Sequence, residues 1–323
     1  MVNKLKDKIL AGDQITPAEA MPLTALSGSQ VYELLHVAWQ VTDHFLGASV
    51  DLCSIINAKS GRCSEDCQFC AQSSYFQTEV DDYPLLDLEK ILDRAQEMEA
   101  AGANRFSLVI SGRGPDQADF TRILKIFRVL KRETGLGLCA SLGIINEEQA
   151  AQLAEVGVTT YHHNLETGRS YFPFICTTHT YDERVQTIQA ARKAGLHVCS
   201  GGILSLGESW ANRVELAFEL RELQVDSVPL NILNPLKGTP LAHLKPMKPL
   251  EVLKTIAIFR LILPQTELRL CGGREPALRS LQPLAFSAGI NALLVGNYLT
   301  TAGRTVTEDV QTLIDLGLKV RRP

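Results

Sequence analysis

Short apolar runs alternate with longer amphipathic stretches along the chain from about residue 49 onward. The short runs have the length and composition of strands, and the longer stretches have the apolar spacing of helices. This pattern predicts strands at 50–57, 104–110, 136–142, 158–164, 196–203, 226–232, 266–271 and 290–296. It predicts helices near 87–102, 117–134, 146–156, 181–195, 208–223, 249–263, 276–288 and 306–316.

Eight strand–helix units in one chain predict an α/β fold, a closed (β/α)8 TIM-type barrel. Glycines such as Gly102, Gly157 and Gly195 end several predicted helices just before the next strand, as is common. An open doubly wound sheet is the main alternative. Its glycine-rich phosphate loop is missing after the first strand, where cysteines stand instead.

Residues 1–48 are predicted to form an N-terminal helical extension that caps the barrel, and 49–323 are predicted to form the barrel domain. Thr16 before Pro17 has the character of a helix start. Apolar side chains at helical spacing predict the buried face of this extension as Tyr32, Leu35, Ala38 and Phe45.

The composition is that of a globular protein, with 45% hydrophobic residues, 21% charged residues and a net charge of −4 over 323 residues. This balance gives no reason to expect nucleic acid as a partner, so small molecules are expected instead. With no unbroken apolar stretch of about 18 residues and no signal-peptide pattern, we expect no membrane association and a cytoplasmic location. The eight cysteines are then free, catalytic or metal-bound.

Three cysteines, Cys63, Cys67 and Cys70, lie in a C-x3-C-x2-C run just after the first predicted strand. Three thiolates on one loop can hold three corners of an iron–sulfur cube and leave one iron open. A zinc knuckle with a fourth ligand elsewhere, or ordinary reduced thiols, are the alternatives. In a barrel, working residues lie at the C-terminal ends of strands, where this loop falls.

Four further cysteines fall on predicted strands 1, 3, 5 and 7: Cys53, Cys139, Cys199 and Cys271. Any one of them could simply fill space in the core. Because alternate strands of a barrel contribute side chains to a common layer, the set predicts a second metal site. Arg269, two residues before Cys271, shares its strand face and is expected to reach the same cavity.

These residues resemble the radical S-adenosylmethionine (SAM) enzymes and, among them, the biotin synthase family. The resemblance covers nearly the whole chain from about residue 35. It is carried by the C-x3-C-x2-C run and by the segments 161–167, 177–184, 198–203, 206–208, 226–231, 237–241, 273–275 and 298–301.

The resemblance implies that Cys63, Cys67 and Cys70 hold a 4Fe-4S cluster whose open iron binds SAM. Reductive cleavage of SAM would give a 5′-deoxyadenosyl radical that removes hydrogen from dethiobiotin, and sulfur insertion would give biotin. We also expect a flavodoxin- or ferredoxin-type electron donor and a homodimer.

The resemblance assigns roles to further residues, and the alternatives are simpler. Asn164 and Glu166 could terminate a strand, Thr300 and Thr301 could cap a helix, Arg184 could be a solvated helix residue, and Lys59 could only tune the electrostatics of the cluster. The implied cofactor-binding residues are Phe69, Asn164, Glu166, Arg184, Gly202 and Glu208. The implied substrate-binding residues are Lys59, Asn231, Thr300 and Thr301, with Asn231 at the ureido group and the other three at the valerate carboxylate. The expected catalytic side chains are Asn164, Asn231 and Arg269.

The chain departs from the usual family pattern, in which three cysteines and an arginine hold an auxiliary 2Fe-2S cluster that supplies the sulfur. Cys139, Cys199 and Arg269 match three of those ligands, but Ser107 stands at the fourth position. Cys53 and Cys271 stand where the usual pattern has serine. Losing one thiolate while gaining two indicates a rearranged cluster.

Our hypothesis is that Cys139, Cys199 and Cys271, with or without Cys53, hold an auxiliary cluster of four irons. If only three thiolates bind, the fourth iron is free to carry sulfur. Cys176 is expected not to be a ligand. Two other functions stay open: another radical reaction on this scaffold, as in a maturase, and a cluster-binding or zinc protein without turnover.

Overall fold

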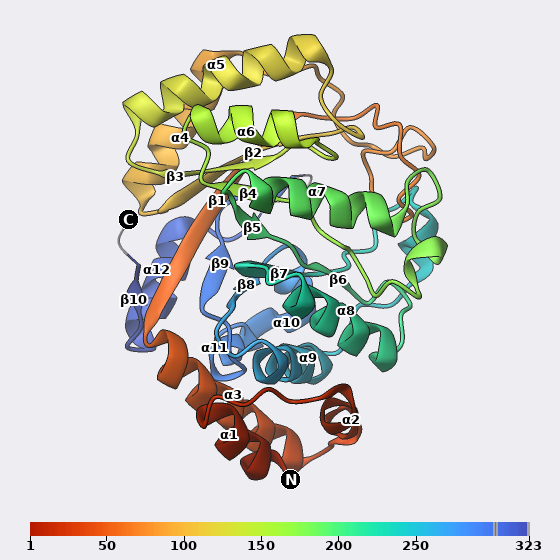
Figure 1. Ribbon diagram of the computed structural model, residues 1–323, viewed down its shortest axis with the longest axis vertical. Helices are drawn as coiled ribbons and strands as arrows, with labels where there is room; N and C mark the ends of the chain where they lie inside the picture. The colour runs from red at the N-terminus through yellow and green to blue at the C-terminus, as the bar shows by residue number, and fades with distance from the viewer. Residues whose placement is uncertain (300, 302, 322–323) are drawn as a thin grey trace.

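A closed barrel of parallel strands forms the body of the protein in a computed structural model that describes residues 1–299, 301 and 303–321 (Figure 1). The barrel closes where Asp51 to Cys53 pair with Ala292 to Leu294, so the predicted (β/α)8 fold is confirmed. The strands are β1 (Ser49–Lys59), β2 (Arg105–Ile110), β3 (Gly137–Ser141), β4 (Thr160–His162), β5 (His197–Cys199), β6 (Gly202–Leu204), β7 (Ser227–Ile232), β8 (Glu267–Leu270), β9 (Ala292–Leu294) and β10 (Lys319–Val320).

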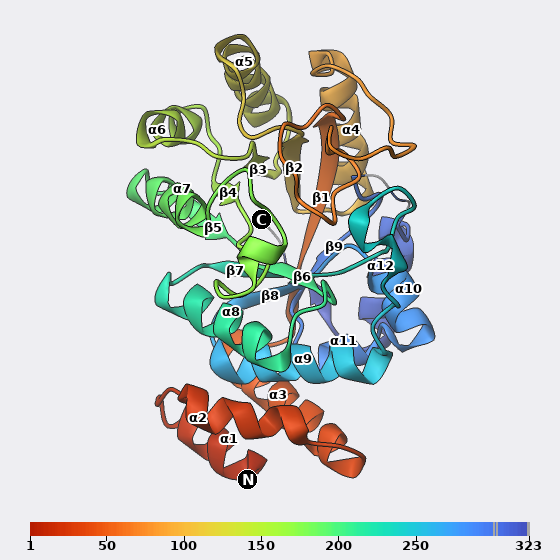
Figure 2. The same ribbon diagram turned by 90° about the vertical axis from the view of Figure 1, so that its right-hand side faces the viewer.

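Helices follow the strands and cover the outside of the barrel (Figure 2). They bury apolar stripes against the strands, as the helical spacing in the sequence predicts. The outer helices are α4 (Leu88–Ala101), α5 (Gln117–Glu133), α6 (Glu147–Glu155), α7 (Tyr181–Lys193), α8 (Trp210–Glu222), α9 (Pro249–Ile262) and α12 (Val306–Asp315).

Two predicted elements are broken in the structure. The helix predicted at 276–288 divides into α10 (Arg274–Leu278), η4 (Arg279–Leu281) and α11 (Leu284–Ser287), because Arg279 has a φ of 55° and Pro283 lacks an N–H. The strand predicted at 196–203 divides into β5 and β6. At the break, a Cβ on Gly201 would lie 2.1 Å from the Pro229 carbonyl oxygen, so only glycine allows this close approach.

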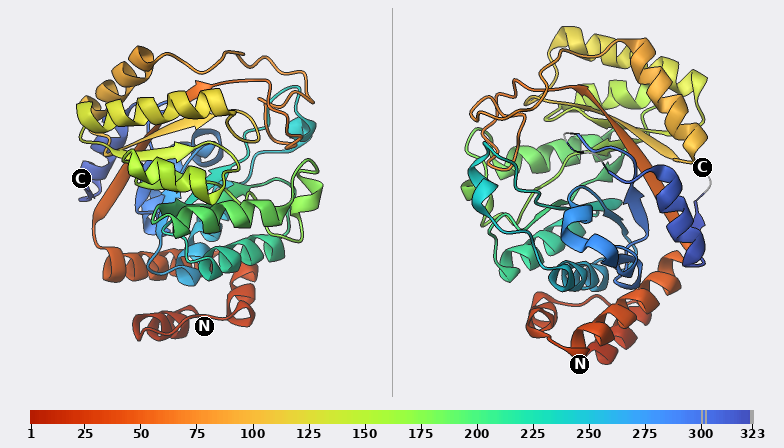
Figure 3. Two further views of the ribbon diagram at one scale, coloured as in Figure 1. Left: turned by 45° about the horizontal axis from the view of Figure 1, so that its top comes forward. Right: turned by 180° about the vertical axis from the view of Figure 1, so that it is seen from behind.

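The N-terminal helices lie at the end of the barrel from which β1 starts, and α3 packs against α9 and α11 (Figures 2 and 3). Thr16 caps the second helix with a capping box, as predicted. The predicted burial of Tyr32 is wrong, because its side chain is 60% exposed and the buried stripe runs one position earlier, through Val31. These helices are α1 (Val2–Leu10), α2 (Pro17–Ala20), η1 (Met21–Ala25) and α3 (Ser29–Leu46).

The division of the chain at residue 48, between the N-terminal helical extension and the barrel domain, stays a prediction.

A short strand that the sequence pattern did not predict, β10, pairs with the start of β1. Among the described residues, no helix is both long enough and apolar enough to cross a membrane.

Candidate active site

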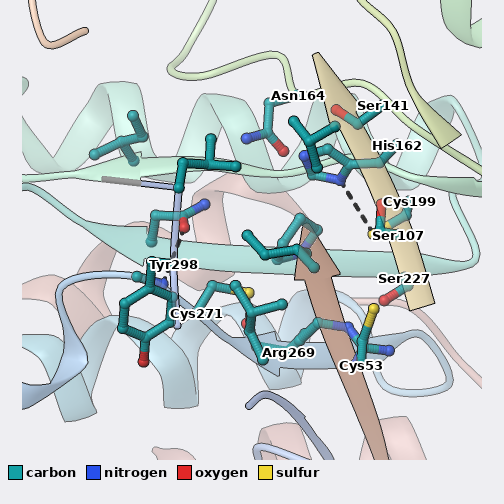
Figure 4. Close-up of a pocket in the computed structure, with 18 of the residues that line it drawn as sticks. Cys53, Ser107, Ser141, His162, Asn164, Cys199, Ser227, Arg269, Cys271 and Tyr298 are labelled. Atoms are coloured by element: carbon teal, nitrogen blue, oxygen red, sulfur yellow. Dashed lines mark hydrogen bonds between the residues drawn. The ribbon is translucent and has the colours of Figure 1, made fainter. Parts of the chain in front are cut away.

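A cavity of about 680 Å³ lies inside the barrel and extends to the cysteine loop (Figure 4). Side chains from every barrel strand and from the loop after β1 line it. The predicted cavity-lining residues that do so are Cys53, Phe69, Cys139, Asn164, Glu166, Arg184, Cys199, Asn231, Arg269, Cys271 and Thr301.

The cysteine loop is held by its own backbone. Cys63 N–H donates to the Gln72 carbonyl at 3.0 Å, and Ser74 N–H donates to the Cys63 carbonyl at 2.8 Å. Cys70 N–H donates to the Cys67 carbonyl at 2.9 Å. Cys67 and Cys70 line the cavity, whereas Cys63 is buried and does not line it. The loop therefore presents two of its three thiols to the cavity.

The chemistry of these thiols fits an iron–sulfur cluster. Burial raises the pKa of Cys63, and burial together with the nearby Cys63 raises the pKa of Cys70 to about 11. A hydrogen bond with Cys176 and burial raise the pKa of Cys67. Buried thiolates that disfavour one another need a compensating cation, and iron supplies that charge.

A hydrogen-bond chain behind the loop leads to the cavity wall. Arg184 Nε–H donates to His179 Nε2 at 3.0 Å, so the His179 proton lies on Nδ1, which donates to the Glu65 carboxylate. Both ring nitrogens are therefore engaged, which makes His179 a poor metal ligand although it lies near Cys67 and Cys176. The chain ties the cysteine loop to Arg184.

Cys176 lies close to the loop, with its sulfur 3.7 Å from that of Cys67 and 3.2 Å from Asp66 Oδ1. A hydrogen bond with Cys67, and then one with His179, lower the pKa of Cys176 to about 4. The absence of Cys176 from the ligand set stays a prediction.

Three of the predicted cofactor-binding side chains meet in one wall of the cavity. Arg184 Nη1 donates to the Asn164 carbonyl at 2.7 Å and lies 3.6 Å from Glu166 Oε1. Asn164 Nδ2 donates to Glu166 Oε2 at 3.3 Å. Burial raises the pKa of Glu166, although the positive charge of Arg184 opposes this effect. The group offers a positive and a negative charge side by side.

Besides Cys63, the predicted residues Gly202, Glu208 and Lys59 do not line the cavity. Gly202 packs directly against the backbone of Glu166. A Cβ at Gly202 would lie 2.3 Å from the Glu166 carbonyl oxygen, so only glycine allows this contact. Glu208 is buried and accepts hydrogen bonds from Ser205 N–H at 2.8 Å and Arg213 Nε at 2.6 Å. Lys59 forms an ion pair with Asp119 at 2.7 Å.

The substrate-binding predictions at the other wall concern Asn231, Thr300 and Thr301. Asn231 Oδ1 accepts from Gly272 N–H at 3.1 Å, which fixes its side chain in the cavity wall. Thr301 also lines the cavity, and its carbonyl accepts from Tyr298 N–H at 2.9 Å. Thr300 lies outside the described residues.

Four interior thiols line the inner part of the same cavity, where Ser107 also faces inward (Figure 4). A hydrogen bond with Cys139 and burial raise the pKa of Cys53, and the same bond lowers the pKa of Cys139 to about 7. Burial raises the pKa of Cys199 to about 12, and it also raises the pKa of Cys271. The prediction from strand parity, that the four interior thiols share one cavity, is therefore confirmed.

A charged floor closes the cavity beneath the four thiols. Arg269 Nη2 donates to Asp51 Oδ1 at 2.6 Å and to the Glu267 carboxylate, and Nη1 donates to the Leu293 carbonyl at 3.0 Å. Arg105 pairs with Asp51 at 3.0 Å, and Arg321 pairs with Glu267 at 2.8 Å. Three guanidinium groups against two carboxylates leave a positive charge, which favours thiolates above it.

His162 on β4 is a cavity residue that the sequence analysis missed. Its Nδ1 lies 3.4 Å from the Cys199 sulfur, and burial followed by the charge of Arg269 lowers its pKa to about 4. The signal was present in the sequence, because His162 stands two residues before Asn164 on the same strand face.

A parallel barrel whose first strand leads into a buried three-cysteine loop at the cavity is the architecture of a radical SAM enzyme. In agreement, the family model described as Radical SAM superfamily matches residues 58–220, and that described as Biotin and Thiamin Synthesis associated domain matches 229–319. A biotin synthase from Pelotomaculum thermopropionicum is 61% identical over 320 residues, 99% of this chain and 100% of that relative. One from Heliobacterium modesticaldum is 57% identical, covering 99% of this chain and 98% of that relative.

The chain therefore belongs to the biotin synthase family, and its activity is that of a biotin synthase. The solved structure of methylornithine synthase matches with a TM-score of 0.87 at 23% identity, covering 98% of this chain and 97% of that one. A maturase of the FeFe-hydrogenase matches with a TM-score of 0.84 at 18% identity, covering 98% and 74%. Both of these solved structures have the same fold as this chain.

Proposed function

We propose that the protein converts dethiobiotin to biotin and draws the inserted sulfur from an auxiliary four-iron cluster inside the barrel. In this proposal Cys139, Cys199 and Cys271 hold that cluster, and Cys53 is the fourth thiol of the site. One observation carries the proposal: these four thiols line the same cavity as the cysteine loop. A substrate in that cavity lies between the two sets of thiols.

Cys63, Cys67 and Cys70 would hold a 4Fe-4S cluster, which when bound would supply the electron for the reductive cleavage of SAM. The protein positions the reactants and excludes water. Arg184 and Glu166 carry the charges that suit the carboxylate and amino groups of SAM, and Asn164 joins them. Asn231 and Thr301, in the wall formed by the later strands, are placed to hold dethiobiotin.

Thiols suit the auxiliary irons better than Arg269 does in this chain. The Arg269 guanidinium gives both terminal nitrogens to Asp51, Glu267 and the Leu293 carbonyl. Although burial alone would lower it, the charges of Glu267 and Asp51 raise the pKa of Arg269 well above its usual value. A protonated guanidinium has no lone pair for a metal, so this arginine balances charge.

Iron and sulfide analysis with Mössbauer spectra of anaerobically prepared protein tests the cluster assignment. Four irons in the second site, lost in Cys139→Ala, Cys199→Ala and Cys271→Ala, support it. Retention of this iron in Cys53→Ala would assign three thiolates and one open iron. A second site of two irons, with the spectrum of a 2Fe-2S cluster, would refute the four-iron proposal.

The activity test is an anaerobic reaction with SAM, reductant and dethiobiotin. Biotin together with 5′-deoxyadenosine supports the proposed reaction. The alanine variants of the interior thiols should still cleave SAM but form no biotin, because their cysteine loop is intact. Formation of 5′-deoxyadenosine without biotin by the wild-type protein would point to another radical reaction.

We propose a flavodoxin- or ferredoxin-type electron donor that docks beside the cysteine loop. Two exposed aromatic side chains flank that loop: Tyr75, 62% exposed, and Phe174, 67% exposed. The Gln68 N–H donates to the Ile175 carbonyl at 3.0 Å, which joins the two segments. Phe174→Ser should slow turnover with the protein reductant but not with dithionite, and Ile314→Ser, exposed on α12, is the control.

We further propose a homodimer in the cytoplasm, where the eight free cysteines stay reduced. Tyr32 and Trp39 lie seven residues apart on one face of α3 and are 60% and 44% exposed, which supports an interface there. Trp39→Arg should convert the dimer to a monomer by light scattering. A wild-type monomer would contradict this part of the proposal.

A further inference from the structure

The His162 ring and the Cys199 sulfur face each other inside the barrel because of strand register. β4 and β5 are parallel neighbours, and His162 is paired with Cys199 across them. The His163 N–H donates to the Cys199 carbonyl at 3.0 Å, which fixes this register. Both side chains line the cavity, with Nδ1 3.4 Å from the sulfur (Figure 4).

The direction of this hydrogen bond follows from the chemistry of the thiol. A cysteine that binds iron is a thiolate and has no proton to donate. The ring nitrogen must then be the donor, as Nδ1–H. Ser227, a second polar neighbour of Cys199, donates its hydroxyl to Glu267 at 2.9 Å, although it also lies within hydrogen-bond reach of the Cys199 sulfur. Because the single Ser227 proton is already donated to Glu267, His162 is the side chain with a proton available for this sulfur.

We propose that His162 is a positioning residue of the auxiliary cluster, whose Nδ1–H donates to the Cys199 sulfur and raises the reduction potential of that cluster. The inference rests on the proposed auxiliary site. A donor at a ligand sulfur draws electron density from it and favours the reduced cluster. It also holds the Cys199 side chain toward the irons, as outer partners of metal ligands do.

The test uses full-length protein in which Cys63, Cys67 and Cys70 are replaced by alanine, so that the auxiliary cluster alone is observed. Its reduction potential is measured by anaerobic titration followed by electron paramagnetic resonance. His162→Leu should lower the potential, because leucine fills the space but donates nothing. His162→Asn should restore most of it, since the amide nitrogen lies near the position of Nδ1.

His163→Leu is the matched control. His163 is adjacent and buried, is not among the residues that line the cavity, and its Nε2 has no hydrogen-bond partner within the described residues. Replacing that unpaired polar atom with an apolar side chain should leave the potential unchanged. Thermal unfolding of each variant checks that the barrel is intact.

Each outcome decides the proposal. Loss of the cluster in His162→Leu but not in His162→Asn also supports it, because the donor is then needed to keep the ligand in place. An unchanged potential in His162→Leu overturns it and leaves the auxiliary site standing. A nitrogen bonded directly to iron, seen in pulsed spectra and lost in His162→Leu, overturns it as well. If the parent protein holds no auxiliary cluster, both this proposal and the proposed site fail.

Discussion

Arg269 and Asp51 form a buried ion pair at the floor of the barrel, with Nη2 2.6 Å from Oδ1 and both side chains almost fully enclosed. The pair joins β8 to β1, two strands that are far apart in sequence. Glu267 shares the same guanidinium nitrogen. Because a buried charge without its partner is costly, this contact links stability to the cluster site.

Arg269→Met should lower the free energy of unfolding by about 3 kcal/mol, since it leaves the buried carboxylates of Asp51 and Glu267 short of positive charge. Urea unfolding of the cluster-free, reduced protein measures this loss. Arg269→Lys keeps the charge and should retain the auxiliary iron. Loss of that iron from a folded Arg269→Lys protein would show that the arginine is a ligand.

Cys67→Ser should remove the loop cluster and abolish 5′-deoxyadenosine formation, because Cys67 lines the cavity and is a proposed ligand of that cluster. Cys176→Ser should keep the iron and reduce SAM cleavage no more than about tenfold, the range typical of an outer hydrogen-bond partner. The two variants change sulfur atoms that lie 3.7 Å apart, so they form a close comparison. Iron loss in both would make Cys176 a ligand.

Arg184→Lys should raise the dissociation constant of SAM about tenfold, because the lysine loses the hydrogen bonds to His179 and Asn164 that fix the guanidinium. Anaerobic calorimetry with the cluster-loaded protein measures this change. Arg192→Lys, an exposed substitution on the same helix, is the control and should bind SAM normally. Equal affinity in Arg184→Lys and the wild type would remove Arg184 from the SAM site.

Glu19 should remain ionised at pH 4, because hydrogen bonds to Lys8 and then to Thr16 lower its pKa from 4.5 to about 2. A lowered carboxylate pKa stabilises the fold fully above the ordinary value of 4.5, and this contribution is lost as the pH falls toward 2. The carboxyl carbon shift of labelled Glu19 should therefore stay constant from pH 7 to pH 4. In Lys8→Met the same carbon should titrate closer to 4.5.

The sequence predicted the barrel because strand and helix periodicities and the glycines at helix ends agree with each other. It missed β10, because that strand forms only by pairing with β1, which is distant in sequence. It also missed the break at Arg279, because the apolar spacing of residues 276–288 does not show the positive φ of Arg279. The burial of Tyr32 was misjudged by one helical position, since a broad apolar stripe does not define its own centre.

The interior thiols could be predicted because strand parity alone decides which side chains face the cavity. The residues that surround those thiols could not be predicted in the same way. Asp51 and His162 are paired with residues on other strands, and such pairs depend on the register between strands. The substrate-binding role of Lys59 stays a prediction, and its ion pair with Asp119 is another contact that the sequence could not show.

The strand β1 runs from the floor of the barrel to the cysteine loop, and it carries Cys53 near one end and Lys59 at the other. At about 3.3 Å per residue, those two positions are roughly 20 Å apart. In the proposed arrangement, β1 therefore sets the spacing between the interior thiols and the cysteine loop. An inserted residue in β1 would lengthen this spacing and would turn the side chains that follow it to the opposite face of the strand, so both the separation and the orientation of the two thiol sites depend on the length of this one strand.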